Sequence, residues 1–165
     1  MKQIFIDGSA GTTGLRIRER LSLRDDITLI TLPEEQRKDP EARRDALLRA
    51  DVAFLCLPDA AAVEAVALAE GAATVLIDTS TAHRTHPDWA YGFAELGFRD
   101  EIRMSRRIAN PGCHASGYLA LVTPPGEGGT SPSRCGAFLL LLDGIHGRRQ
   151  KDDRRIRVPR KRSPL

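Results

Sequence analysis

Apolar segments alternate with helical segments along the first half of the chain. Four short segments are predicted to be strands: residues 2–7, 27–32, 51–57 and 74–78. The third of them is apolar almost throughout, as a strand covered on both faces is. The segments between them have helical patterns: residues 15–21, 40–50 and 58–70. This regular alternation predicts an α/β fold with a doubly wound parallel sheet and right-handed connections.

The pattern is less regular after residue 78. Residues 91–96 are predicted to form a loop, residues 101–108 a short strand or helix, and residues 116–123 a helix. We expect one domain over residues 1–124, because 165 residues suffice for one core and not for two full domains. Residues 125–165 change in composition towards Gly, Pro, Ser and Arg, which predicts a disordered tail.

A glycine-rich turn with the spacing G-x-x-G-x-x-G joins the first strand to the first helix. In Rossmann-type domains such glycines allow a tight turn, close approach of a pyrophosphate and close helix–strand packing, and the helix N-terminus binds the phosphates. We therefore predict a Rossmann-type doubly wound sheet. The alternative is a plain strand–helix turn, because G-x-G-x-x-G is the commoner spacing. The predicted cofactor-binding residues of this turn are Gly8, Ser9, Ala10, Gly11, Thr12, Thr13 and Gly14.

A basic pair follows the second strand. NAD sites usually place an acidic residue after this strand, where it binds the ribose diol. Arg37 and Lys38 stand in this part of the chain, and their positive charges suit a 2′-phosphate, which favours NADP as the cofactor. The alternative is a solvated basic pair at the start of a helix.

Cys113 follows Pro111-Gly112 in a loop that runs into a helix. Backbone N–H groups at a helix start stabilise a thiolate and hold an oxyanion, so we predict Cys113 as a catalytic nucleophile. A buried structural thiol is the alternative. His114 is adjacent, and we expect its side chain to point away from the thiol. A nucleophilic cysteine and a dinucleotide fold together suggest hydride transfer through a thioester.

Polar residues follow the fourth strand. Ligands of open α/β sheets bind beyond the carboxyl ends of the strands, so Ser80 and Arg84 are placed to contact the cofactor or an anionic substrate. For Arg84 the alternative is a surface salt bridge. His83, in the same segment, and Cys56, inside the third strand, are both predicted to be structural.

Composition argues against several classes of function. No apolar run approaches the length of a membrane span, and we expect no signal peptide. Three cysteines at unrelated spacings predict neither a disulfide framework nor a metal site, which favours a cytoplasmic chain with reduced thiols. The net charge of +3 is uneven: residues 147–165 hold nine Lys or Arg and two Asp, which leaves 16 basic and 20 acidic residues elsewhere. This distribution argues against a nucleic-acid-binding fold.

Four motifs in order resemble one enzyme family. They are residues 4–15 (IFIDGSAGTTGL), 77–84 (IDTSTAHR), 91–96 (YGFAEL) and 109–117 (ANPGCHASG). Together they resemble the shorter bacterial form of N-acetyl-gamma-glutamyl-phosphate reductase, over roughly residues 1–124. The Asn-Pro-Gly-Cys stretch alone also fits aspartate-semialdehyde dehydrogenase, a relative.

This resemblance implies NADPH-dependent reduction of N-acetyl-glutamyl 5-phosphate to N-acetylglutamate 5-semialdehyde, a step of arginine biosynthesis. Cys113 matches the family's nucleophile, and residues 8–14 match its cofactor loop. Within the motifs we place Ser80 in the cofactor site, and Arg84 and Asn110 in the substrate site. NADP(H) is then the cofactor, and the partner is a small-molecule substrate, not a nucleic acid or a membrane.

The chain departs from the family after these motifs. The family's second domain supplies a catalytic histidine, substrate contacts and the dimer interface, and we expect this chain to lack that domain. Loss of a general acid or base typically lowers the rate by about 10²–10⁴-fold, so we expect impaired catalysis, and we do not expect the family's homo-oligomer. The competing interpretation is a non-catalytic nucleotide-binding fragment.

Three interpretations fit residues 125–165. They are a disordered linker with a solvated basic tail, a nucleic-acid-binding tail, and translation out of frame, which we favour. Residues 142–157 can be encoded so that a one-base shift reads Leu-Thr-Gly-Tyr-Thr-Gly-Gly-Gly-Lys-Lys-Met-Ile-Asp-Glu-Tyr, which resembles the opening of the family's second domain. Sequencing the gene tests this hypothesis, because an in-frame continuation with no family-like sequence in the shifted frame would exclude it.

Overall fold

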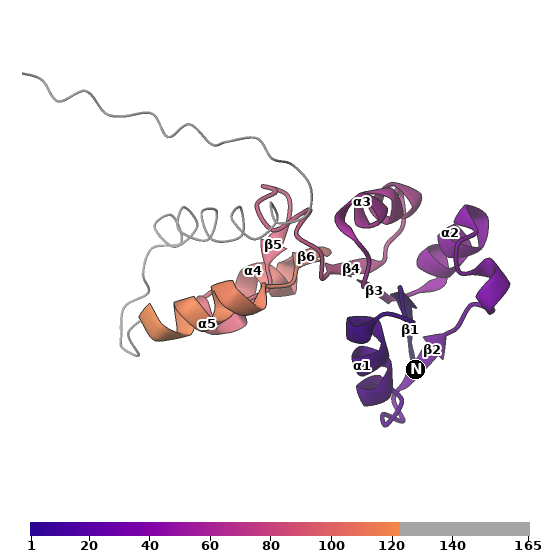
Figure 1. The fold of residues 1–165 in the computed structure, drawn as a ribbon, viewed down its shortest axis with the longest axis horizontal. Helices are drawn as coiled ribbons and strands as arrows, with labels where there is room; N and C mark the ends of the chain where they lie inside the picture. The colour runs from indigo at the N-terminus through magenta and orange to yellow at the C-terminus, as the bar shows by residue number, and fades with distance from the viewer. Residues whose placement is uncertain (123–165) are drawn as a thin grey trace, which may run out of the picture.

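The structure, a computed structural model, describes residues 1–122. Six strands form one sheet in the order β2-β1-β3-β4-β6-β5, and every neighbouring pair is parallel. Figure 1 shows α1 on one face of this sheet and α2 and α3 on the other. The prediction of a doubly wound parallel α/β sheet is confirmed. The predictions for residues 125–165 lie outside the described residues.

The elements follow one another with short connections. The strands are β1 (Lys2–Asp7), β2 (Ile27–Ile30), β3 (Val52–Leu55), β4 (Val75–Asp78), β5 (Ala90–Tyr91) and β6 (Arg107–Ala109). The α-helices are α1 (Thr12–Leu21), α2 (Pro40–Arg49), α3 (Asp59–Leu68), α4 (Arg99–Met104) and α5 (Cys113–Val122). Two 3₁₀ turns are η1 (Glu34–Gln36) and η2 (Ala94–Leu96).

Three predictions about local structure need correction. The predicted loop over residues 91–96 contains the end of β5 and all of η2, because pairing with β6 recruits Tyr91 into the sheet. The single element predicted over residues 101–108 is two, since α4 and then β6 occupy this segment. The last helix begins at Cys113 rather than Ser116, so the thiol belongs to its first turn.

The main core is built largely from small residues between the sheet and the helices α2 and α3. Ala46, Ala53 and Ala65 are fully buried, and so are Leu47 and Leu55. Alanines at these positions let the helices approach the strands closely, while each buried leucine contributes about 1.5–3 kcal/mol of hydrophobic stabilisation. Close packing therefore holds α2 and α3 against this part of the sheet.

A second apolar cluster holds α5 against the edge of the sheet. Tyr91 of β5 is buried with Ala115 and Leu119 of α5, and Phe93 and Leu96 pack against them. The spacing of Ala115 and Leu119, four residues apart, places both on one face of the helix. Packing of this face determines where the helix start, and therefore Cys113, lies.

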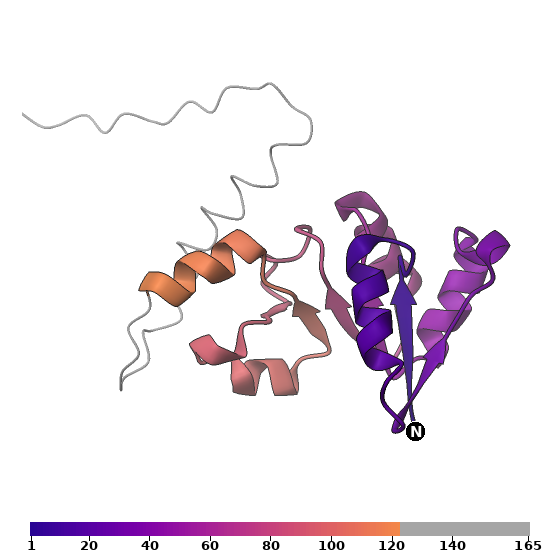
Figure 2. The same ribbon diagram turned by 60° about the horizontal axis from the view of Figure 1, so that its bottom comes forward.

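The register of the parallel strands brings their carboxyl ends to one level. Asp7 pairs with Leu55, Leu55 with Asp78, and Asp78 with Ala109. Figure 2 shows β1 and β6 pointing the same way, towards the starts of α1 and α5. The glycine turn after Asp7 and the Cys113 loop after Ala109 thus leave the same edge of the sheet, where open α/β sheets bind ligands.

Candidate active site

The glycine turn after β1 contains two positions that require glycine. Gly8 has a φ of +84°, and a Cβ on it would overlap the carbonyl oxygen of Cys56. A Cβ on Gly14 would overlap the carbonyl oxygen of Gly8. Gly11, the N-cap of α1, differs, because its Cβ would meet only the Gly8 oxygen, at 3.4 Å. Gly8 and Gly14 are thus needed for the fold, whereas protein packing does not require a glycine at position 11.

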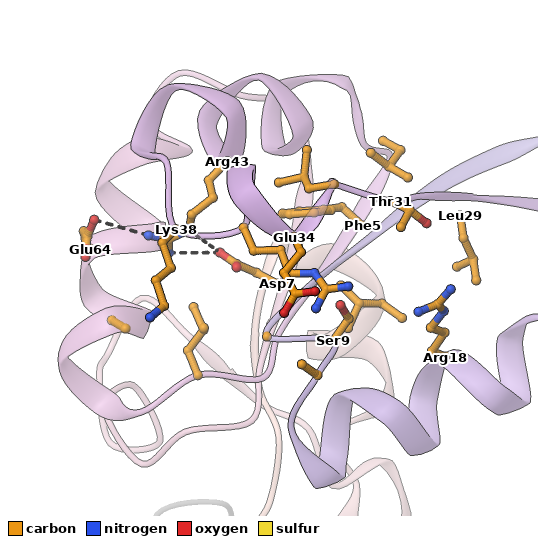
Figure 3. A pocket seen from close by; sticks show the side chains of 18 residues that line it. Phe5, Asp7, Ser9, Arg18, Leu29, Thr31, Glu34, Lys38, Arg43 and Glu64 are labelled. Carbon is orange, nitrogen blue, oxygen red and sulfur yellow. Dashed lines mark hydrogen bonds and ion pairs between the residues drawn. The ribbon is translucent and has the colours of Figure 1, made fainter.

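A cavity of about 530 Å³ lies beside this turn, between the ends of β1 and β2 (Figure 3). Gly8, Ser9 and Ala10 of the predicted cofactor loop line it. The other predicted loop residues, 11–14, and Ser80 are not part of its lining. The cavity therefore corresponds to the part of a dinucleotide site that follows the second strand, where the adenosine ribose lies in Rossmann-type domains.

Arg37 and Lys38 both line the cavity, which places the predicted basic pair at the predicted cofactor site. Arg37 is half-buried, and its Nε atom is buried without a hydrogen-bond partner among residues 1–122. A buried donor without a partner costs free energy, and an anion in the cavity would satisfy it. Arg18 of α1, which the sequence pattern did not single out, adds a further positive charge to the cavity wall (Figure 3).

A buried ion pair also borders the cavity. Asp7 accepts hydrogen bonds from Nε and Nη2 of Arg43 in α2, both at 3.0 Å, and Nη1 of Arg43 reaches Glu64 of α3 at 3.3 Å (Figure 3). Burial raises the pKa of Asp7, and the hydrogen bonds and charge of Arg43 offset this only in part. The sequence pattern missed Arg43 and Glu64. The one available signal was a charged residue, Asp7, directly after the apolar residues 4–6 of β1.

The loop after β4 is fixed by the fully buried Asp78. Its carboxylate accepts hydrogen bonds from the backbone N–H of Ser80 at 2.9 Å and from the Ser80 hydroxyl at 2.7 Å. Nδ1 of His83 lies 2.6 Å from the same carboxylate, and the imidazole stacks on Trp89 with ring centroids 4.2 Å apart. The structural role predicted for His83 is confirmed. Ser80 contacts Asp78, so its predicted cofactor contact stays a prediction.

Arg84 and Asn110 lie together, as expected for neighbouring strand ends. Nε of Arg84 donates a hydrogen bond to the backbone carbonyl of Asn110 at 3.1 Å, and Nη2 donates one to the carbonyl of Thr79 at 3.2 Å. These contacts join Arg84 to the backbone of both segments. The substrate contacts predicted for Arg84 and Asn110 stay predictions.

Cys113 is exposed at the first residue of α5, which excludes the alternative of a buried structural thiol. Its Sγ lies 3.4 Å from Nδ1 of His114, so the expectation that His114 points away is wrong, because the helix start lets the two adjacent side chains meet. Cys56, in contrast, is half-buried, and burial raises the pKa of its thiol to about 11. Of these two thiols, Cys113 is therefore the one suited to nucleophilic chemistry.

The described residues lack two further features. Among residues 1–122, no helix is both long and apolar enough to cross a lipid bilayer. Within the same residues, no group of three or more His, Cys, Asp or Glu side chains could hold a metal ion.

Comparison with known families agrees with this geometry. The sequence profile of the family "semialdehyde dehydrogenase, NAD binding domain" matches residues 3–105. Among solved structures, the fold is similar to aspartate semialdehyde dehydrogenase II of Vibrio cholerae, with a TM-score of 0.56 and 20% identity over 75% of this chain and 46% of that one. It is also similar to aspartate semialdehyde dehydrogenase of Francisella tularensis, with a TM-score of 0.57 and 17% identity over 72% and 39% of the two chains.

Some curated proteins have higher sequence identity to this chain than these solved structures do. Proteins of Brucella canis and Brucella anthropi named N-acetyl-gamma-glutamyl-phosphate reductase are each 56% identical over 148 residues, which cover 88% of this chain. The chain spans 48% of the length of these relatives. Because 88% of a 165-residue chain exceeds 124 residues, the aligned stretch extends beyond the four motifs. With the profile matching more than half of its residues, the chain belongs to the semialdehyde dehydrogenase family and carries that family's NAD-binding domain.

Proposed function

We propose that this chain is the cofactor-binding and nucleophile-bearing part of an NADPH-dependent N-acetyl-gamma-glutamyl-phosphate reductase. One observation carries the proposal: an exposed thiol begins α5 at the same sheet edge that holds the glycine turn. The names of the Brucella relatives support the choice of substrate, N-acetyl-glutamyl 5-phosphate, and of arginine biosynthesis as the process.

The residues present fit a phosphorylated dinucleotide. The turn through Gly8 places the N-terminal N–H groups of α1 at the sheet edge, where they bind phosphate. Residue 11 of the turn needs no glycine for packing, which supports close approach of a pyrophosphate. The buried Nε of Arg37 and the nearby Lys38 supply donors for a 2′-phosphate.

The chemistry then proceeds on the Cys113 sulfur. The thiolate attacks the carbonyl carbon of the acyl phosphate, the bond from that carbon to the phosphate oxygen breaks, and inorganic phosphate leaves a thioester on Cys113. NADPH supplies, when bound, the hydride that reduces the thioester carbon. The carbon–sulfur bond breaks as the thiolate is restored, and N-acetylglutamate 5-semialdehyde is released. Arg84 and Asn110 are proposed to border the bound substrate, and Ser80 to lie close to the cofactor.

The remaining parts of the proposal follow from this chemistry. The partners are small molecules rather than nucleic acids or membranes. A nucleophilic free thiol functions in a reducing compartment, which supports the cytoplasm. For residues 125–165 we retain the proposal of translation out of frame, and we do not propose the family's homo-oligomer for this chain.

A stoichiometric burst tests the proposal without requiring full turnover. The chain is mixed with N-acetylglutamate semialdehyde and NADP in the absence of phosphate, and NADPH absorbance is followed. We expect a burst of up to one NADPH per chain, together with a hydroxylamine-labile acyl adduct on Cys113 detected by mass spectrometry. Cys113→Ser should abolish both, whereas Cys56→Ser should retain them. Addition of phosphate then measures turnover.

Other outcomes separate the alternatives. An undiminished burst in the Cys113→Ser variant would contradict the proposal. NADPH binding with no burst in the unmodified chain would favour a non-catalytic nucleotide-binding fragment. A larger burst with aspartate semialdehyde would instead favour the substrate in the names of the structural neighbours.

A further inference from the structure

Both backbone polar groups of Asn110 are held by the end of β4 and the loop that follows it. The N–H of Asn110 donates to the backbone carbonyl of Asp78 at 2.7 Å, and its carbonyl accepts from Nε of Arg84 at 3.1 Å. Asn110 precedes Cys113 by three residues, at the point where the chain leaves β6 for α5. The direction in which the chain leaves the sheet is thus set from the neighbouring strand.

The loop that carries Arg84 is itself held by several contacts. The buried carboxylate of Asp78 binds Ser80 and His83, and the Ser80 hydroxyl accepts from the N–H of Ala82 at 3.2 Å. His83, the residue before Arg84, is fixed further by its stack on Trp89. A buried carboxylate with three donors and a stacked imidazole restrict this loop to one arrangement.

We infer that Arg84 is a positioning residue for the thiol of Cys113, held in place by the buried Asp78–His83 pair, an inference that rests on the proposed role of Cys113 as nucleophile. The guanidinium bridges the carbonyls of Thr79 and Asn110, and so joins the loop after β4 to the loop that carries the thiol. This bridge keeps Cys113 at the start of α5, where backbone N–H groups stabilise an anionic sulfur.

Arginine suits this role because of its geometry and not only its charge. Nε and Nη2 are donors in a rigid planar fork, and each points at a different carbonyl. A lysine ammonium is a compact point charge on a flexible stem, so it cannot hold both carbonyls in the same fixed relation. Arg84→Lys therefore separates the effect of charge from the effect of bridging.

The test measures the reactivity of Cys113 rather than turnover. The 165-residue chain and the variants Arg84→Lys and Arg84→Gln are treated with iodoacetamide, and mass spectrometry gives the alkylation rates of Cys113 and Cys56 separately. Arg106→Gln, an exposed arginine just before β6, is the matched control. NADPH affinity and hydrogen exchange of the peptide containing residues 110–113 are measured on the same proteins.

The inference predicts a change confined to the thiol loop. The Cys113 alkylation rate should fall by about tenfold in both Arg84 variants, the size expected when a hydrogen bond to a charged group no longer holds the reactive arrangement. Hydrogen exchange at residues 110–113 should become faster. The Cys56 rate, NADPH affinity and the Arg106→Gln protein should remain unchanged.

A second pair of variants tests the support beneath Arg84. His83→Asn keeps a donor close to the position of Nδ1 and loses the stack on Trp89, whereas His83→Phe keeps an aromatic ring and loses the donor. We expect His83→Asn to retain most of the Cys113 alkylation rate and His83→Phe to lower it. The reverse order would refute the part assigned to the Asp78–His83 pair.

Three results would overturn the inference. Full Cys113 reactivity in Arg84→Lys would mean that charge alone suffices. A parallel fall of Cys113 reactivity and NADPH affinity would mean that Arg84 only maintains the fold. If Cys113 of the unmodified chain reacts no faster than Cys56, the proposed nucleophile is wrong, and the inference fails with it. This outcome can be told apart from a failure of the inference alone, because it is observed without any Arg84 variant.

Discussion

β1 and β4 each end in a buried aspartate, and the two carboxylates are stabilised in different ways. Asp7 and Asp78 lie at the same level of the sheet, on either side of Leu55. Asp7 pairs with Arg43, which belongs to a helix 36 residues further along the chain, and this ion pair borders the cavity. Asp78 is bound by its own loop, through Ser80 and His83.

The two ends of this sheet edge therefore differ in how their charged groups are satisfied. On the β1 side, charged groups remain around an open cavity, and the buried Nε of Arg37 has no partner in the described part of the chain. This arrangement supports the proposal that the cavity binds a charged ligand. On the β4 side, the buried carboxylate is satisfied by local donors, and the loop it fixes holds the strand that leads to the thiol. This arrangement supports the proposal that the loop fixes the position of the Cys113 thiol.

The largest expected effect is on the free energy of unfolding when the partner of either aspartate is removed. Arg43→Leu leaves Asp7 buried without its cation, which should lower the free energy of unfolding by about 3–5 kcal/mol. His83→Phe leaves Asp78 with both Ser80 hydrogen bonds, so the loss should be about 1–3 kcal/mol. Urea denaturation measures both values. Equal losses of stability in Arg43→Leu and His83→Phe would contradict the difference between the two aspartates. The double variant Asp7→Leu/Arg43→Leu should be more stable than Arg43→Leu, since it removes the unpaired charge.

The next effect separates the glycines that shape the turn from the one that faces a ligand. Gly14→Ala forces a Cβ against the Gly8 backbone and should destabilise the fold by about 1–3 kcal/mol. Gly11→Ala meets only an ordinary contact, so its melting temperature should stay near that of the unmodified chain while NADPH affinity falls. Calorimetry and fluorescence titration measure the two quantities. A strongly destabilised Gly11→Ala variant would contradict this division.

A smaller effect tests the cations around the cavity. Arg37→Gln and Lys38→Gln should each weaken NADPH binding by about tenfold, close to 1.4 kcal/mol, and leave NADH binding nearly unchanged, because only NADPH carries the 2′-phosphate. Arg44→Gln, an exposed arginine of α2 outside the cavity lining, is the matched control. Equal weakening of NADPH and NADH would show that the pair does not read the 2′-phosphate.

The smallest expected effect is the pH dependence contributed by Asp7. Burial raises its pKa in the folded chain above the ordinary 3.8, so the folded state holds the proton more tightly than the unfolded state. The contribution of Asp7 to stability is therefore complete below pH 3.8 and declines as the pH rises through the folded-state pKa. Denaturation across this pH range measures the free energies of unfolding of the chain and of Asp7→Asn. The stability of the variant relative to the chain should increase as the pH rises. A trend in the opposite direction would mean that Arg43 outweighs burial.

Much of the fold could be predicted because its signals are local. Apolar residues at positions 4–6 of β1, 52–55 of β3 and 75–77 of β4 identified these strands, since the centres of strands covered on both faces contain few polar residues. The two residues of β5 could not be recognised, because pairing with β6 rather than composition makes Ala90–Tyr91 a strand. Local patterns similarly gave the positions of Arg37 and Cys113, at the cavity and at a helix start.

The contacts between distant residues were not predictable in the same way. In the sequence, Arg43 is indistinguishable from the other charged residues of its helix. Only the packing of α2 on the sheet brings it to Asp7. His114 was expected to point away from the thiol, and the helix that begins one residue earlier than His114 changes that direction. In both cases the partner is selected by backbone geometry that no short stretch of sequence contains.

The sequence by itself determined the order of strands and helices, the glycine turn and the placement of Cys113 after Pro111-Gly112, because backbone preferences and apolar periodicity act within a few residues. Only the tertiary structure decided that Asp7, Asp78 and Ala109 end their strands at one level, and that Arg84 bridges to Asn110. The physical reason is that parallel neighbours are distant in sequence. Their register, and every hydrogen bond between the loops that follow, exists only after the whole sheet has packed.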